Sequence, residues 1–137
     1  MGRGIAISFA WAGLPVALVD SEERTSETFA ELAATTREEL QTECHSLADA
    51  GIVSSTVVNE IAARINLFAR AESHDCLQAA EVVFEAVAEV LEIKQSTYAW
   101  LSEAASETAI FASTTSTMLA DTLAGFVTHA ERFTNAH

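Results

Sequence analysis

Several residue types are scarce in this 137-residue sequence, and each scarcity excludes a class of protein. Two cysteines, Cys44 and Cys76, are too few for a disulfide framework, so we expect a reduced, cytoplasmic chain. Lysine and arginine total 7 against 20 aspartates and glutamates, which gives a formal net charge of −13. Because such a surface repels phosphate groups, we expect neither nucleic acid nor an anionic membrane surface as a partner.

Long hydrophobic runs are also absent. The longest apolar run, residues 5–19, is broken by Gly13 and Pro15 and is too short to span a bilayer. A signal peptide is the alternative, with Arg3 as its charged flank, but residues 16–20 lack the small-x-small pattern of a cleavage site. Hydrophobic residues make up 50% of the chain, which excludes disorder and suits the core of one domain.

Helical and strand-like patterns alternate along the chain. Gly13 ends a predicted helix over residues 4–12, and Pro15 precedes a short apolar strand over 16–19. A long polar helix then ends at Gly51, and Ser54 or Ser55 caps the second helix of a helical hairpin. The further predicted strands are 65–69, 82–84, 109–112 and 133–137, and the further predicted helices are 89–105 and 122–126. This alternation predicts an α/β fold whose mostly parallel sheet has helices on both faces.

Both ends of the sequence fall inside predicted elements. The first residues belong to a helix with no strand before it, and the last residues belong to a strand with nothing after it. Because a domain rarely begins and ends inside packed elements, we expect residues 1–137 to be part of a longer protein.

Four segments, in order, carry motifs of one known family. Gly2 to Asp20 resembles the end of a GxGxMGxGIAxxFAxxGxxVxLxD motif, in which Gly2 is the third glycine. The other three segments match family motifs: VVFEAV at 82–87 matches DxViEAv, FASTTS at 111–116 matches ASNTS, and RFTNAH at 132–137 matches RFxGxHFFNP. Lys94 also matches a lysine that is usual after the glutamate motif. The chain thus resembles the 3-hydroxyacyl-CoA dehydrogenase family over essentially its whole length. The resemblance implies a Rossmann-like NAD-binding domain, here without the family's first strand and C-terminal helical domain.

The absent first strand has a structural consequence. In this fold it lies centrally in the sheet, between the strand ending at Asp20 and the strand over 82–84. We therefore expect these two strands either to be separated by a gap or to be forced together, with exposed apolar edges. We also expect residues 1–137 alone to be catalytically inactive.

The resemblance implies a site for NAD. Gly2, at the start of a helix, lets the backbone approach a pyrophosphate, which the helix N-terminus attracts. Asp20 follows at about the 20-residue spacing expected of the acid that binds the adenosine ribose. Its charge would repel a 2′-phosphate, so NAD is expected rather than NADP, and Arg24 is the one nearby cation that could reverse this preference. The structural alternative for Asp20 is an ordinary turn residue at a strand end.

The resemblance also implies catalytic residues. Glu85 would lie beside the nicotinamide ribose, and Thr114, where the family has asparagine, would lie near the nicotinamide amide. Ser116 matches the serine that hydrogen-bonds near the substrate hydroxyl and the nicotinamide. His137 matches the histidine that takes the hydroxyl proton as hydride passes to NAD. The structural alternatives are a solvated capping acid for Glu85, a loop residue bonded to its own backbone for Ser116, and a structural histidine for His137.

The implied substrate is a 3-hydroxyacyl-CoA of fatty-acid β-oxidation, and the longer parent is expected to be a homodimer. Residues 22–50, however, hold seven glutamates and one aspartate but only Arg24 and Arg37 as arginines, a poor match to the phosphates of CoA. A dehydrogenase of other hydroxy acids, of the lambda-crystallin or carnitine dehydrogenase type, therefore stays open. So does a non-catalytic remnant or interaction module.

Three further patterns indicate no additional function. Cys44-His45 and His74-x-Cys76 lack the regular paired spacing of zinc ligands, so no metal is expected. Ser116 and His137 do not indicate a hydrolase, because no GxSxG elbow is present. The glutamate-rich segment 22–43 is most simply a solvated helix face.

Overall fold

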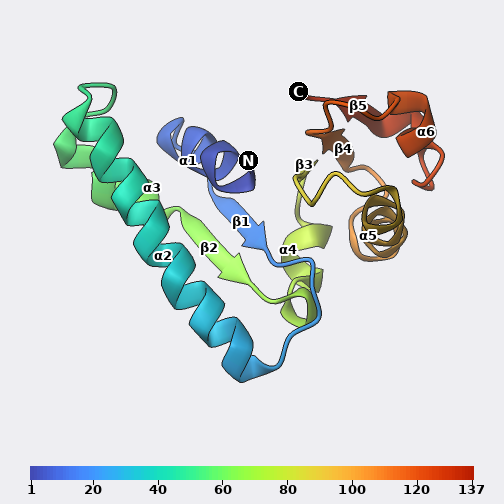
Figure 1. Ribbon diagram of the computed structural model, residues 1–137, viewed down its shortest axis with the longest axis horizontal. Helices are drawn as coiled ribbons and strands as arrows, with labels where there is room; N and C mark the ends of the chain where they lie inside the picture. The colour runs from blue at the N-terminus through green and yellow to red at the C-terminus, as the bar shows by residue number, and fades with distance from the viewer. The chain divides into compact units, whose positions relative to one another are not determined.

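The computed structural model describes all of residues 1–137, which divide into two compact units, Arg3–Ala71 and Glu72–His137 with Met1–Gly2 (Figure 1). The helices are α1 (Gly2–Trp11), α2 (Ser26–Asp49), α3 (Val58–Ala63), α4 (His74–Gln78), α5 (Leu91–Ala104) and α6 (Ala120–Ala124). The strands are β1 (Val16–Val19), β2 (Ile65–Phe68), β3 (Val82–Glu85), β4 (Ile110–Ser113) and β5 (Phe133–Asn135). Three 3-10 turns, Ser55–Val57, Arg70–Glu72 and Ala130–Arg132, complete the chain.

All strands are parallel, and they form two separate sheets. β1 pairs with β2 over the full length of both strands. β4 lies between β3 and β5, and its last residue, Ser113, stands opposite Glu85 of β3 and Asn135 of β5. No pairing joins β1 to β3, so of the two outcomes expected for these strands the structure shows a break in the sheet. The predicted α/β class with parallel strands is also confirmed, and the strands form two small sheets.

In the unit of residues 3–71, helices α1, α2 and α3 pack against the β1–β2 pair (Figure 1). The buried positions of α2 are Ala33, Thr36, Leu40 and Cys44, a stripe at helical spacing, and the acidic remainder of the helix is mostly exposed. Each fully buried leucine or isoleucine of such a core contributes roughly 1.5–3 kcal/mol. The core side chains of this unit are Ala6, Ile7, Ala10, Leu40, Cys44, Val53, Val58, Ile61 and Ile65.

Two glycines end helices as the sequence predicts. Gly13 after α1 has φ +92°, and Gly51 after α2 has φ +72°, a conformation that other residues rarely adopt. The amide after each glycine donates to the carbonyl five residues earlier, from Leu14 at 3.1 Å and from Ile52 at 2.9 Å. Ser54 caps the turn before α3 by accepting from the amide of Thr56, as expected for the helical hairpin.

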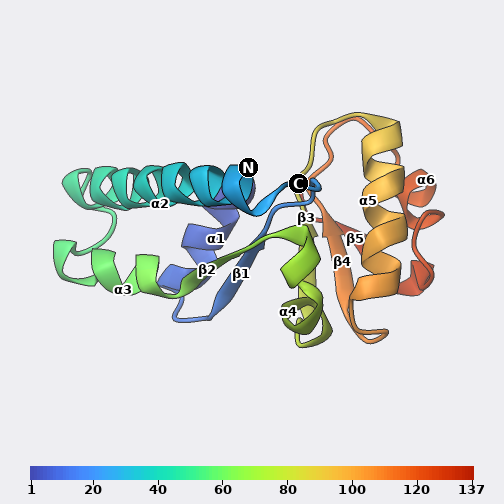
Figure 2. The same ribbon diagram turned by 90° about the horizontal axis from the view of Figure 1, so that it is seen from below.

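In the unit of residues 72–137, α5 lies along the three-stranded sheet (Figure 2). The ring of Tyr98 packs edge-on against Phe111 of β4 at 6.4 Å and against Phe133 of β5 at 5.6 Å between ring centroids. Leu77, Leu101, Ala105, Ala109, Leu123 and Val127 complete the buried apolar cluster of this unit. The ring of Tyr98 thus connects α5 with β4 and β5.

Several element boundaries differ from the sequence prediction. The short helix α4 was not predicted, because five residues carry too little periodicity to stand out. α5 begins at Leu91 and not at residue 89, because Val90 is extended (φ −127°, ψ 125°) and the Glu89 side chain is engaged by a loop described below. α1 begins at Gly2, α6 covers Ala120–Ala124, and β5 ends at Asn135, so His137 lies beyond the strand.

No helix combines the length and the apolar character needed to cross a membrane.

Candidate active site at the carboxyl ends of the strands

The carboxyl ends of β3, β4 and β5 meet at one edge of their sheet, where open parallel sheets bind ligands. Glu85 ends β3, and the loop of residues 114–117 follows β4. The amide of Ala136 donates to the carbonyl of Ser113 at 2.8 Å, which continues the pairing of β5 toward His137. The topology therefore brings three of the sequence-predicted segments to one edge.

Glu85 is the centre of a buried polar network at this edge. Its side chain and that of Lys94 are both 0% exposed. Lys94 Nζ lies 2.9 Å from each carboxylate oxygen of Glu85. Tyr98 and Ser113 each donate a hydroxyl to Oε2 at 2.7 Å, and the amide of Val87 donates to Oε1 at 2.8 Å. Every group in the network thus has a partner, which a buried ion pair requires.

This burial changes the interpretation of Glu85. The sequence predicts that Glu85 lies beside a ribose, but its carboxylate has no exposed surface and is surrounded by five donor contacts. The structure instead places it beneath the edge, where it joins the ends of β3 and β4 to α5. Burial is the main cause that raises the pKa of Tyr98 far above its usual range, so its phenol stays a hydrogen-bond donor.

Glu89 holds the loop that follows β4. Its Oε1 accepts hydrogen bonds from the amides of Ser116 and Thr117, both at 3.1 Å, and from the hydroxyls of Thr117 at 2.9 Å and of Thr115. Its Oε2 lies 3.3 Å from Lys94 Nζ. The hydrogen bond from Thr115 is the main cause that lowers the pKa of Glu89 to about 2, so the carboxylate is ionised at neutral pH.

The residues expected to meet the substrate and nicotinamide differ in accessibility. Ser116 is exposed, and Thr114 is half-buried, with its amide donating to the carbonyl of Glu85 at 3.0 Å. His137 is exposed at the end of the described chain. Ser116 and His137 are therefore open to a ligand, and Glu85 is not.

Asp20 lies directly after β1, in the other unit. Its amide donates to the carbonyl of Phe68 at 3.0 Å and so extends the pairing of β1 with β2. Oδ2 accepts from Arg24 Nε at 2.6 Å, and Oδ1 accepts from the amide of Glu22 at 3.2 Å. This bond to Asp20 is the main cause that raises the pKa of Arg24. Because a carboxylate has about four acceptor positions, Asp20 retains room for further donors.

Gly2 begins α1, and the first turn of this helix carries no acidic residue. A Cβ atom at Gly2 would lie 3.4 Å from the Cβ of Ala86, which is a close but ordinary contact. The amide groups of a first helical turn have no partner within the helix, so this end favours an anion.

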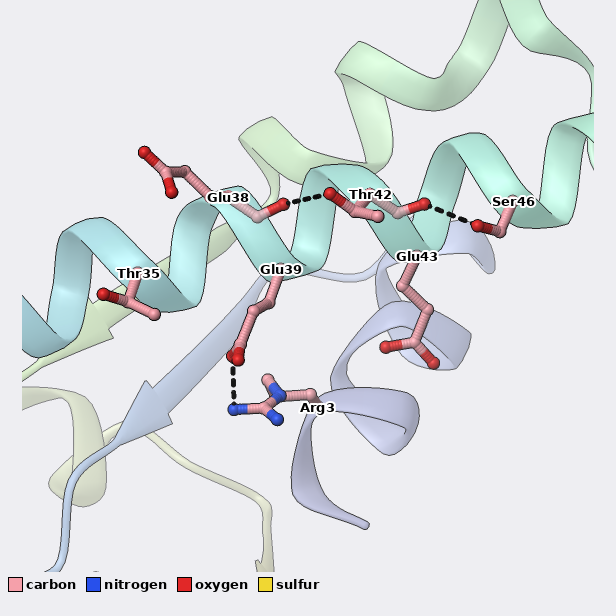
Figure 3. Close-up of a pocket in the computed structure, with 7 residues that line it drawn as sticks. All are labelled: Arg3, Thr35, Glu38, Glu39, Thr42, Glu43 and Ser46. Carbon is pink, nitrogen blue, oxygen red and sulfur yellow. Dashed lines mark hydrogen bonds and ion pairs between the residues drawn. The ribbon is translucent and has the colours of Figure 1, made fainter.

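A hollow on the surface lies elsewhere, on the exposed side of α2 (Figure 3). It is lined by Glu38, Glu39 and Glu43 together with Arg3, whose guanidinium pairs with Glu39 at 2.7 Å. None of the sequence-predicted site residues lines it. Its net negative charge disfavours a phosphate-bearing ligand.

The cysteines and histidines form no recognisable site. Cys44 is buried and Cys76 is half-buried, and burial is the main cause that raises the pKa of both thiols. No group of three histidine, cysteine, aspartate or glutamate side chains is placed to hold a metal ion.

Sequence reasoning did not identify Glu89, Tyr98 and Ser113 as members of the polar network. One signal was available: Lys94 is the only lysine in the chain, and it stands four residues before Tyr98, on the same face of α5. A lysine at a core position of a helix requires an acid nearby. That requirement points to the glutamates that precede the helix.

Comparison with known proteins agrees with this arrangement. Residues 1–137 match the family described as 3-hydroxyacyl-CoA dehydrogenase, NAD binding domain. Among solved structures, the chain is 26% identical to 3-hydroxybutyryl-CoA dehydrogenase from Escherichia coli, with a TM-score of 0.82. This match covers 100% of the present chain and 27% of the Escherichia coli chain. It is 28% identical to (S)-3-hydroxybutyryl-CoA dehydrogenase from Ralstonia eutropha, with a TM-score of 0.78, covering 100% of this chain and 45% of that one.

A third structure, M. tuberculosis FadB2, is 24% identical with a TM-score of 0.84 and supports the fold. This match covers 100% of the present chain and 45% of the FadB2 chain. The chain thus spans less than half the length of each of these three proteins. Because the family match extends over all of residues 1–137, the chain belongs to the NAD-binding domain family of the 3-hydroxyacyl-CoA dehydrogenases, a family of oxidoreductases whose cofactor is NAD.

Proposed function

We propose that residues 1–137 are the NAD-binding part of a dehydrogenase that oxidises a 3-hydroxyacyl-CoA, or a related hydroxy acid, to the 3-oxo form. The observation that carries the proposal is the family match over the whole chain. Two features of the structure support it: an acid directly after β1, and a serine-bearing loop directly after β4. The longer protein would be a cytoplasmic homodimer that acts on a small-molecule substrate.

The residues present suit NAD. Asp20 retains acceptor capacity at the end of a parallel strand, and its side chain is 13% exposed, so two ribose hydroxyls could donate to it. Gly2 stands at the start of a ten-residue helix, and the free amides of this helix end would hold the pyrophosphate. Bound NAD would supply the acceptor for hydride. The roles of Gly2 and Asp20 are to hold and orient the cofactor.

Three residues would act at the reacting end. The exposed hydroxyl of Ser116 would align the substrate hydroxyl, and His137 would take its proton as hydride leaves the same carbon. Thr114 would line the nicotinamide side of the loop. We assign Glu85 a supporting role: it holds Ser113 and Lys94 beneath this edge and does not contact the ribose.

A second candidate is a dehydrogenase of hydroxy acids without CoA. The observation that favours it is the charge of α2, which includes Glu38, Glu39 and Glu43 on one exposed face and would repel the phosphates of CoA. 3-Hydroxybutyryl-CoA and free 3-hydroxybutyrate separate the two candidates. Preference for the thioester supports the first, and preference for the free acid supports the second.

The experiment uses the longer protein that contains residues 1–137. We expect formation of NADH when a hydroxy substrate is added, and we expect His137→Asn to lower kcat by about 10²–10⁴-fold through loss of the base. His45→Asn, an exposed histidine on α2, is the matched control and should leave kcat unchanged. Binding of NAD without oxidation of any hydroxy substrate would contradict the proposal and favour a non-catalytic module.

A further inference from the structure

The loop between β1 and α2 contains a set of paired charges. Residues 20–24 read Asp-Ser-Glu-Glu-Arg, so three acids share one cation. Arg24 Nε donates to Asp20 Oδ2 at 2.6 Å, and Arg24 Nη2 donates to Glu22 Oε2 at 2.7 Å. The amide of Glu22 also donates to Asp20 Oδ1 at 3.2 Å. The guanidinium of Arg24 is thus held by two carboxylates at once.

The start of this loop is anchored independently of Arg24. Arg70, in the turn after β2, donates Nη1 to the carbonyl of Ser21 at 3.0 Å, and the amide of Asp20 extends the pairing of β1 with β2. The side chain of Asp20 is 13% exposed, whereas that of Glu22 is 71% exposed. The Arg24–Glu22 pair therefore lies on the solvent side of a fixed Asp20, and the guanidinium can move without displacing the strand end.

A 2′-phosphate on the adenosine ribose would meet unfavourable charges here. A phosphate monoester carries about −1.5 to −2 of charge at pH 7, and an arginine is the side chain that usually receives it. Residues 20–24, however, have a formal charge of −2, from three acids and one arginine. Both Nε and Nη2 of Arg24 already donate to carboxylates. The guanidinium would have to leave at least one of them to receive the phosphate.

We propose that Glu22 is a specificity-determining residue, which holds Arg24 beside Asp20 and so keeps the guanidinium from a 2′-phosphate. The proposal rests on the ribose role proposed above for Asp20. The sequence alone leaves open whether Arg24 reverses the preference for NAD, and with Glu22 in place it does not. A different mechanism is that Glu22 acts through its negative charge alone, as any acid near the phosphate would.

The test is calorimetric titration of the longer protein with NAD and with NADP, which differ only in the 2′-phosphate. Low ionic strength is used, because exposed ion pairs are then least screened. In Glu22→Gln the guanidinium loses an ionised acceptor, so we expect NADP to bind roughly two- to fivefold more tightly, the range that an exposed ion pair supports. The affinity for NAD should change by less than about twofold.

Glu23→Gln is the matched control. It removes the same charge one position along the loop, from an exposed side chain that forms no ion pair with Arg24. We expect it to raise the affinity for NADP by less than about twofold. NAD binding that persists in each variant shows that the site is folded.

Arg24→Gln completes a double-mutant cycle. In this background Glu22→Gln should no longer raise the affinity for NADP, because the guanidinium that would receive the phosphate is absent. An equal gain from Glu22→Gln with and without Arg24, or an equal gain from Glu23→Gln, would show that charge alone acts and would overturn the proposal. Unchanged NADP affinity in Glu22→Gln would overturn it as well.

The two proposals fail in different ways. If the longer protein binds NAD but oxidises no hydroxy substrate, the proposed function fails, and the NADP titrations still decide the role of Glu22. If NADH forms but Glu22→Gln and Glu23→Gln behave alike, the proposed function stands and the role of Glu22 is refuted.

Discussion

Lys94→Met should destabilise the unit of residues 72–137 strongly. The substitution keeps most of the side-chain volume but removes the ammonium that lies 2.9 Å from both oxygens of the buried Glu85 carboxylate. Removing one partner of a buried ion pair costs about 3–5 kcal/mol, because the other charge is left uncompensated. Tyr98 and Ser113 still donate to that carboxylate, so we expect the lower end, about 3 kcal/mol.

The assay is urea unfolding followed by the fluorescence of Trp100, which packs on the core of this unit, in a Trp11→Phe background. With an m-value of about 1–3 kcal/mol/M, the midpoint should fall by roughly 1–3 M. Arg37→Met, an exposed site on α2, should change stability by no more than about 0.5 kcal/mol. Adding Glu85→Gln to Lys94→Met should recover part of the loss. A loss below about 1 kcal/mol for Lys94→Met would refute the buried pair.

Three further predictions concern other parts of the chain. Asp20→Ala should weaken NAD binding about ten- to a hundredfold, from the roughly 1.5–3 kcal/mol of charge-assisted hydrogen bonds, and NADP binding much less; equal losses in a fluorescence titration would make Asp20 only structural. Because the pKa of Glu89 is lowered, its carboxylate stabilises the fold above about pH 4.5, and this contribution is lost as pH falls toward about 2. Glu89→Gln should therefore flatten that part of the acid unfolding curve. Parallel unfolding curves for the variant and the unmodified protein would contradict this prediction. Gly13→Ala should lower the melting temperature, because Gly13 has φ +92°. Gly4→Ala should raise the melting temperature, because nothing lies within 4 Å of the added Cβ. A change of the melting temperature in the same direction for both variants would contradict these backbone conformations.

The sequence predicted the features that depend on neighbouring residues. Gly13 and Gly51 mark helix ends because a positive φ is a local requirement, and both ends are confirmed. The position of Asp20 directly after a strand follows from the short apolar run between Pro15 and Val19. Motif resemblance then identified the family, since four ordered segments constrain one another.

The features that the sequence did not reveal depend on contacts between distant residues. Glu89 was assigned to the start of a helix, since the periodic pattern of α5 continues backward to it. Its bonds to Ser116 and Thr117 join residues 27 and 28 positions apart, and no local pattern predicts them. The burial of Glu85 likewise follows from Lys94 and Tyr98 reaching it from another element.

The measurement that tests the central claim most directly is NADH formation by residues 1–137 and by the longer protein, side by side, with 3-hydroxybutyryl-CoA and NAD. We expect the longer protein to supply the glycine turn that the resemblance implies before Gly2 and the group that orients His137; an unoriented base loses much of its roughly 10²–10⁴-fold contribution. We therefore predict turnover by the longer protein and none by residues 1–137 alone. Equal turnover by both, or none by either with this thioester or with free 3-hydroxybutyrate, would contradict the account.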